Sequence, residues 1–156
     1  MNFDKDKNSV TIDADGCPVT KLACRIACEY GIRCVVVCDS AHYFDPDSLH
    51  GALVKTVSQG ADSADLYIVN SIKCGDIVIT QDYGLAALCL SRNAAAVDQN
   101  GRIYSDLNIP GLLESRAANK KLLRSGRHPK GAKKRKRESD TEFEKTLRRI
   151  IENGEA

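Results

Sequence analysis

The chain has 156 residues, 42% of them hydrophobic, which is enough for one domain with a substantial core. No apolar run approaches the roughly 20 residues of a membrane span, and the N-terminus is polar and charged, so we expect a cytoplasmic protein without a signal peptide or a membrane partner. The net charge of +2 hides a basic segment, residues 116–137, which holds 11 of the 23 basic residues and no acidic one.

The first predicted element is a short buried strand over residues 10–12, followed directly by Asp13 and Asp15. Residues two apart in a strand face the same side, so both carboxylates are expected in one space beyond the strand end. Such carboxylates repel each other, and Mg²⁺ binds proteins through one or two of them. The alternative is that one aspartate caps the next helix and the other is a solvated turn residue.

Helices and strands then alternate, which predicts a three-layer α/β/α domain with a mainly parallel sheet of about five strands. The predicted strands cover residues 10–12, 32–38, 52–58, 77–80 and 94–97. The predicted helices cover residues 19–30, 63–73, 85–91, 106–123 and 142–151. Residues 43–51 are predicted as a loop, residues 102–104 as a hairpin strand, and residues 139–142 as a capping box. Pro110 predicts an early break in its helix.

These elements suggest a division of the chain into four parts. Residues 1–9 are expected to be a disordered N-terminus, and residues 10–124 to form the α/β domain. Residues 125–138 follow as a basic flexible segment. Residues 139–153 contain a C-terminal helix that packs on or near the domain.

Three separate stretches bring aspartates toward one edge of the predicted sheet. Asp13 and Asp15 end the first strand, and Asp82 follows the strand over residues 77–80. Asp62 and Asp65 begin the helix before that strand. In parallel α/β sheets the site lies beyond the carboxyl ends of the strands, and two-metal phosphoryl-transfer sites need such acids. The simpler alternatives are a helix cap for Asp62, a helix-dipole interaction for Asp65 and a turn for Asp82.

The basic segment suggests contacts with the phosphates of a nucleic acid. It contains no aromatic residue, so we expect it to bind the backbone without base stacking. A solvated linker or an interaction tail is the alternative. The candidate contacts are Arg124, Arg127, Lys130, Lys133, Lys134, Arg135, Lys136 and Arg137.

The seven cysteines contain no Cys-x-x-Cys pair. We interpret them as small, reduced and buried residues, with a zinc or iron–sulfur site as the alternative.

Four motifs together resemble one protein family over nearly the whole chain. They are IDADGCPV over residues 12–19, ADLYIVN over 64–70, GDIVITQDYGLA over 75–86 and GRIY over 101–104. They resemble the bacterial YaiI/YqxD family, which is placed among PIN-like domains. The resemblance implies a PIN-like fold and a nuclease dependent on Mg²⁺ or Mn²⁺ that acts mostly on RNA.

The resemblance also implies roles for individual residues. Asp13, Asp65 and Asp82 match the acids that coordinate metal at the strand ends, with Asp15 and Asp62 as supporting candidates. The motif around residues 39–42 also resembles a family position. It makes Ser40 and His42 candidates for contacting the substrate, although a solvated loop histidine is the simpler interpretation.

The sequence therefore predicts a metal-dependent nuclease, with RNA as the favoured partner. A nucleic-acid-binding protein without catalysis and a metal-dependent phosphatase acting on a small phosphoester stay open as alternatives. A homodimer also stays open, although no exposed hydrophobic stripe demands one.

Overall fold

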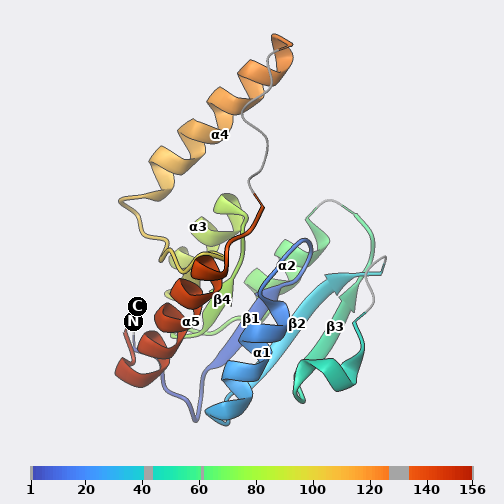
Figure 1. Ribbon diagram of the computed structural model, residues 1–156, viewed down its shortest axis with the longest axis vertical. Helices are drawn as coiled ribbons and strands as arrows, with labels where there is room; N and C mark the ends of the chain where they lie inside the picture. Colours follow the sequence, from blue (N-terminus) through green and yellow to red (C-terminus); the bar gives the residue numbers. More distant parts are fainter. Residues whose placement is uncertain (1, 41–43, 61, 127–133, 156) are drawn as a thin grey trace.

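The protein folds around a single sheet, and the computed structural model describes residues 2–40, 44–60, 62–126 and 134–155. Five strands, all parallel, follow the order β3-β2-β1-β4-β5 (Figure 1). The strands are β1 (Ser9–Asp13), β2 (Arg33–Asp39), β3 (Leu53–Val57), β4 (Ile77–Ile79) and β5 (Ala95–Val97). The helices are α1 (Thr20–Glu29), α2 (Ser63–Ser71), α3 (Tyr83–Ser91), α4 (Ile109–Arg124) and α5 (Arg137–Asn153). The predicted three-layer α/β/α fold with a parallel five-stranded sheet is confirmed.

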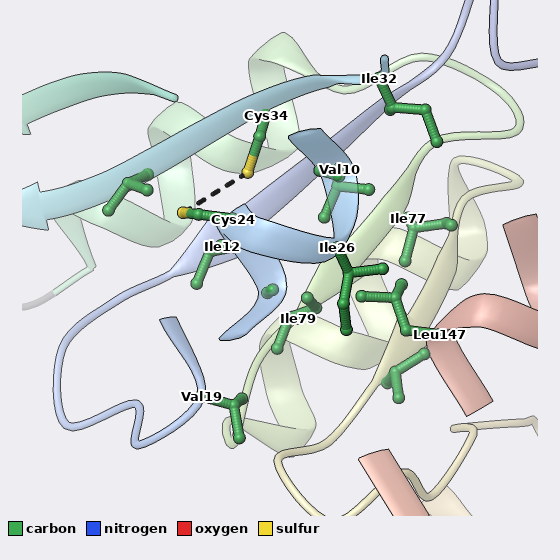
Figure 2. Packing of buried hydrophobic residues seen from close by; sticks show 14 of the residues in the cluster. Val10, Ile12, Val19, Cys24, Ile26, Ile32, Cys34, Ile77, Ile79 and Leu147 are labelled. Atoms are coloured by element: carbon green, nitrogen blue, oxygen red, sulfur yellow. Dashed lines mark hydrogen bonds between the residues drawn. The ribbon is translucent and has the colours of Figure 1, made fainter. Parts of the chain in front are cut away.

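Each face of the sheet is buried beneath its own layer of helices. Successive strand residues face opposite sides, so Ile77 and Ile79 of β4 pack in one cluster and Val78 packs in the other. The first cluster includes Ile26 of α1 and Leu147 of α5 (Figure 2). The second cluster includes residues of α2 and α3. Burial on both faces explains the β-branched residues of the central strands β1, β2 and β4, whereas the edge strand β3 is largely exposed.

Helix α5 begins earlier than predicted and has a different cap. It starts at Arg137 rather than at residue 142, and its N-cap residue Lys136 makes no side-chain capping bond, so the predicted capping box is wrong. Glu138 and Asp140 lie in the first turn, where the helix dipole favours acids. Gly101, at φ 84°, comes so close to α5 that an added Cβ would lie 2.7 Å from the Glu142 carbonyl oxygen.

The N-terminal residues pack on the domain, whereas the sequence suggested disorder over residues 1–9. Phe3 is buried, and its backbone N–H donates to the Gly154 carbonyl oxygen at 2.7 Å. Asn2 and Glu155 form an isolated antiparallel bridge. The two ends of the chain consequently lie side by side (Figure 1).

Helix α4 projects from the body of the domain beside α3 (Figure 1). Pro110 falls in the first turn of α4 and does not break the helix. Backbone N–H groups of the first turn have no intrahelical acceptor, so the missing N–H of proline costs no helical hydrogen bond there. Ile103 forms one bridge to Val97 instead of a hairpin strand. The predicted loop over residues 43–51 contains a short 3₁₀ helix, Pro46–Leu49.

The cysteines are all free, and four of the seven are buried. Cys28 and Cys74 are exposed and Cys17 is half-buried, so the prediction of buried cysteines is wrong for these three. The Cys34 thiol donates to the sulfur of Cys24 at 3.8 Å in the layer between β2 and α1 (Figure 2).

No helix in the described ranges is both long and apolar enough to cross a membrane.

Candidate active site

A cavity of about 720 Å³ opens at the carboxyl edge of the sheet. The strand order reverses between β1 and β4, and ligands of open α/β sheets bind at this kind of switch point. The walls include all the aspartates predicted for the site, together with one more that ends β2. These are Asp13, Asp15, Asp62, Asp65, Asp82 and Asp39. The three acidic stretches therefore meet in one space.

Thr80 connects Asp13, the last residue of β1, with Asp82, which follows β4. These strands are neighbours, with Ile12 opposite Ile79, so Asp13 and Thr80 are brought side by side. The Thr80 hydroxyl donates to Asp13 Oδ2 at 2.9 Å and accepts from the Asp82 backbone N–H at 3.0 Å. One hydroxyl therefore fixes the positions of both acidic residues.

The helix-capping roles differ from those predicted. Asp82, for which a turn residue was the simpler alternative, is the N-cap of α3: its Oδ1 accepts from the backbone N–H groups of Gly84 at 2.8 Å and Leu85 at 3.2 Å. Asp62, expected as a cap, precedes α2 but makes no side-chain capping bond. Its backbone is left-handed, with φ 71°, an uncommon conformation for a residue other than glycine. Asp65 lies in the first turn of α2 as predicted.

Burial and nearby acidic residues make ionisation of Asp13 and Asp65 unfavourable. Burial, with smaller contributions from Asp65, Asp15 and Asp82, raises the pKa of Asp13 to about 6, against the opposing effect of the Thr80 hydrogen bond. Burial also raises the pKa of Asp65, and Asp82 and Asp62 add to this. In the described part of the chain, Asp13, Asp65 and Asp82 form no salt bridge. The negative charge of this group is therefore incompletely balanced by the protein.

The chemistry of these donors fits a hard divalent cation, which prefers carboxylate oxygens. Among the described residues, Asp13 Oδ1, Asp82 Oδ2 and both oxygens of Asp65 accept no hydrogen bond, so they are available as ligands. The side chains nevertheless do not form a closed shell: nowhere in the described residues do three or more His, Cys, Asp or Glu side chains stand as a ready metal site. A cation here would draw the carboxylates together.

Another part of the cavity lining is basic and polar. It comes from one face of α4, where the spacing i, i+1, i+4, i+5 places Ser115, Arg116, Asn119 and Lys120 together. Tyr83 and Gln81 also line the cavity. None of these six residues was predicted for the site, although Arg116 and Lys120 belong to the basic segment.

Part of the basic segment lines a second cavity of about 420 Å³, which shares Gln81 with the first. Lys134, Arg135 and Lys136 contribute to it. Arg135 is held in place, because its Nε donates to Asp140 at 2.7 Å and its Nη1 donates to Asn100 at 2.8 Å. The two cavities therefore form adjoining acidic and basic spaces.

Comparison with known proteins identifies the family of this chain. Residues 11–153 match the family model described as "Uncharacterized BCR, YaiI/YqxD family". The chain belongs to this family. It is 46% identical to a UPF0178 protein of Exiguobacterium sibiricum over 91% of this chain and 95% of that protein. It is also 45% identical to a UPF0178 protein of Natranaerobius thermophilus over the same shares. No solved structure matches, and the PIN-like relationship stays a prediction.

The remaining predicted contacts of this YaiI/YqxD family member are less closely associated with the cavities. Arg124 at the end of α4 and Arg137 at the start of α5 are exposed and are not among the residues that line either cavity. Ser40 is exposed and also lies outside both linings. His42, Arg127, Lys130 and Lys133 lie outside the described residues.

Proposed function

We propose that this protein is a metal-dependent phosphodiesterase that acts on nucleic acid, with RNA as the favoured substrate. The observation that carries the proposal is the convergence of aspartates from three chain segments on one cavity at the switch point of the sheet. The raised pKa of Asp13 supports it, since a cation would offset the cost of keeping that carboxylate ionised.

In this proposal, Asp13, Asp65 and Asp82 hold Mg²⁺ or Mn²⁺, with Asp15 and Asp62 in support. A divalent cation there supplies Lewis-acid stabilisation of charge on the phosphate and lowers the pKa of water. Thr80 keeps Asp13 in position, and the amides of α3 fix one oxygen of Asp82 while its other oxygen faces no hydrogen-bond donor among the described residues. The protein therefore orients its acids before the substrate arrives.

The basic residues beside the acidic cavity favour a polyanionic substrate. Lys134 and Lys136 are exposed in the adjoining cavity, and Arg116 and Lys120 line the far wall of the first. Phosphate contacts from such residues give salt-dependent affinity without a sequence code. A phosphodiester chain that crosses both cavities would meet basic side chains on either side of the acids.

Metal binding and RNA cleavage should be measured on the same set of variants. We expect calorimetry to detect Mn²⁺ binding to the wild type and cleavage of labelled single-stranded RNA in Mn²⁺. Asp13→Asn should lose both, with cleavage reduced by about a hundredfold or more, because it removes a charge from the centre of the cavity. Asp82→Asn should weaken both metal binding and cleavage. Its amide oxygen can still cap α3, but the substitution removes the negative charge and replaces one carboxylate oxygen with an NH₂ group.

The matched control is Asp106→Asn, which makes the same chemical change at an exposed position outside the cavity lining. It should bind Mn²⁺ and cleave RNA like the wild type. Full cleavage by a folded Asp13→Asn variant would refute the proposal. Salt-sensitive RNA binding that EDTA does not alter, without cleavage, would identify a binding protein instead. Hydrolysis of p-nitrophenyl phosphate without RNA cleavage would identify a phosphatase.

A further inference from the structure

Arg116 and Lys120 are cationic side chains that have no acidic partner among the described residues. Both are exposed on α4 and line the acidic cavity, and neither forms a salt bridge with another described residue. They are one turn apart, so their charges lie together on the wall that faces the aspartates. A pair of cations in the same cavity as acidic residues is suited to a negatively charged ligand whose repulsion from the aspartates is offset by a bound cation. A phosphate accompanied by a divalent cation is such a ligand.

Tyr83 provides an aromatic surface in the same cavity. It is the first residue of α3, directly after Asp82, and it is half-buried. Its ring lies 6.0 Å from the ring of Tyr104 at an interplanar angle of 62°, the edge-to-face arrangement of a stable aromatic pair. Tyr104 is itself buried, and its hydroxyl donates to the Thr80 carbonyl oxygen at 3.1 Å. Tyr83 therefore packs against a buried tyrosine and also lines the cavity.

The geometry points to a nucleotide subsite formed by Tyr83, Arg116 and Lys120, which takes one unpaired nucleotide of a single-stranded nucleic acid. The base stacks on Tyr83, and the phosphate lies against the two cations of α4. Base–aromatic stacking is insensitive to sequence, so the subsite selects for an unpaired base rather than for a particular one. This inference rests on the proposed function, because it concerns the substrate of the same cavity.

The size of the cavity favours a single strand over a duplex. Its volume of about 720 Å³ lies within the range of pockets that enclose one small organic ligand, which corresponds to about one or two nucleotides. A base in a duplex is paired and stacked on both sides, so it cannot present a free face to Tyr83 without being extruded from the helix. Selection for unpaired nucleotides therefore follows from the shape and the aromatic wall together.

The test is fluorescence anisotropy in Mg²⁺ with a labelled oligouridylate and with an RNA duplex of equal length. All variants are made in the Asp13→Asn background, which lowers the negative charge of the cavity and prevents cleavage under the proposed function. We expect Lys120→Gln to weaken binding of the single strand by about three- to tenfold, and Arg116→Gln to do the same. Tyr83→Leu should weaken it by about five- to a hundredfold, and Tyr83→Phe should bind like its parent.

Lys121→Gln is the matched control for Lys120→Gln. It removes the same charge from the neighbouring position on α4, which is exposed but does not line the cavity. We expect it to change affinity less than twofold. A second readout is the fluorescence of a single 2-aminopurine in the oligonucleotide. Stacking should quench it on binding, and the quenching should persist in Tyr83→Phe and disappear in Tyr83→Leu.

Three outcomes would overturn the subsite. They are equal effects of Lys120→Gln and Lys121→Gln, unchanged affinity and quenching in Tyr83→Leu, and duplex binding as tight as single-strand binding. Should Tyr83→Leu fail to fold, the comparison of Lys120→Gln with Lys121→Gln decides alone, since both positions are exposed. Because this assay does not require cleavage, it can succeed when the wild type cleaves no RNA. Conversely, if the wild type cleaves RNA while these variants bind it normally, the proposed nuclease activity stands and the proposed nucleotide subsite is contradicted.

Discussion

The same pair of strands carries a buried aspartate at one end and a partly buried one at the other, and the two are stabilised very differently. Asp76 lies just before β4 at the amino edge, beside the first residue of β1. Its Oδ1 accepts from Ser9 N at 2.9 Å and Asn8 Nδ2 at 3.0 Å, and its Oδ2 accepts from Lys73 N at 2.8 Å. The chain therefore supplies hydrogen-bond donors to both oxygens of Asp76.

Asp13 lies at the opposite, carboxyl edge, and its side chain has a single hydrogen-bond donor among the described residues, the Thr80 hydroxyl. Acidic neighbours surround it instead, and its pKa is raised to about 6. The contrast shows how a structural carboxylate can be distinguished from a candidate functional one. The first is satisfied by the fold, whereas the second retains ligating capacity and costs the fold stability.

The largest effect that this comparison predicts is the loss of stability in Asp76→Ala. The substitution leaves the Ser9 and Lys73 N–H groups and the Asn8 amide without their acceptor in a buried place. We expect the free energy of unfolding to fall by about 4 kcal/mol, which corresponds to about 8–16 °C in melting temperature for a domain of this size. Urea denaturation monitored by circular dichroism would measure it.

Asp106→Ala is the control for that experiment, since Asp106 is exposed and its side chain has no hydrogen bond to another described residue. It should change stability by no more than about 0.5 kcal/mol. A loss below about 1 kcal/mol in Asp76→Ala would mean that its three hydrogen bonds are not what anchors β1 to β4, and the contrast with Asp13 would collapse.

Asp13→Asn should have the opposite sign and a smaller size. Because the folded pKa of about 6 lies above the ordinary 3.8, ionisation destabilises the fold. That penalty is absent below about pH 3.8, grows up to about pH 6 and is complete above it. In metal-free buffer at pH 8 we expect Asp13→Asn to gain about 1–2 kcal/mol, less than the full shift implies because the site is partly exposed.

Thermal unfolding in EDTA at pH 8 and at pH 3.5 would measure this gain. The stabilisation should be present at the higher pH and absent at the lower one. The same gain at both values would show that charge is not its source. Addition of Mn²⁺ at pH 8 should then stabilise the wild type more than the variant, because ligand binding to the folded state adds to its stability.

The convergence of the acidic residues could be predicted because it depends mainly on strand direction. Once β1 and β4 are recognised as buried parallel strands, their carboxyl ends must meet at one edge, which brings Asp13 and Asp82 together. The switch of capping roles could not be predicted. Asp62 and Asp82 both precede a helix, but the left-handed backbone of Asp62 leaves its side chain without a capping bond. Sequence does not specify that local conformation for an aspartate.

The basic wall was missed for a different reason. Arg116 and Lys120 are spaced for one face of a helix, but exposed charges with this spacing usually face solvent. Only the position of α4 beside α3 turns that face toward the cavity. Similarly, Tyr83 precedes the helix predicted over residues 85–91, and its pairing with Tyr104 depends on residues 21 positions apart meeting in the second core cluster.

The smallest predicted effect concerns Thr80, the residue that joins the two acids. Thr80→Val keeps the shape of the side chain but removes the one hydroxyl that, in the described part of the chain, donates to the Asp13 carboxylate and accepts from the Asp82 N–H. We expect a loss of about 1 kcal/mol at pH 8 and a further rise in the pKa of Asp13, since this hydrogen bond favours its ionised form. The pH range over which Asp13 affects stability should therefore move upward, whereas Thr80→Ser, which keeps the hydroxyl, should leave it in place. If Thr80→Val and Thr80→Ser shift that range equally, the methyl group of Thr80 matters rather than its hydroxyl. The Thr80 hydroxyl would then not stabilise the ionised Asp13 carboxylate, and the contrast drawn between Asp13 and Asp76 would have to be revised.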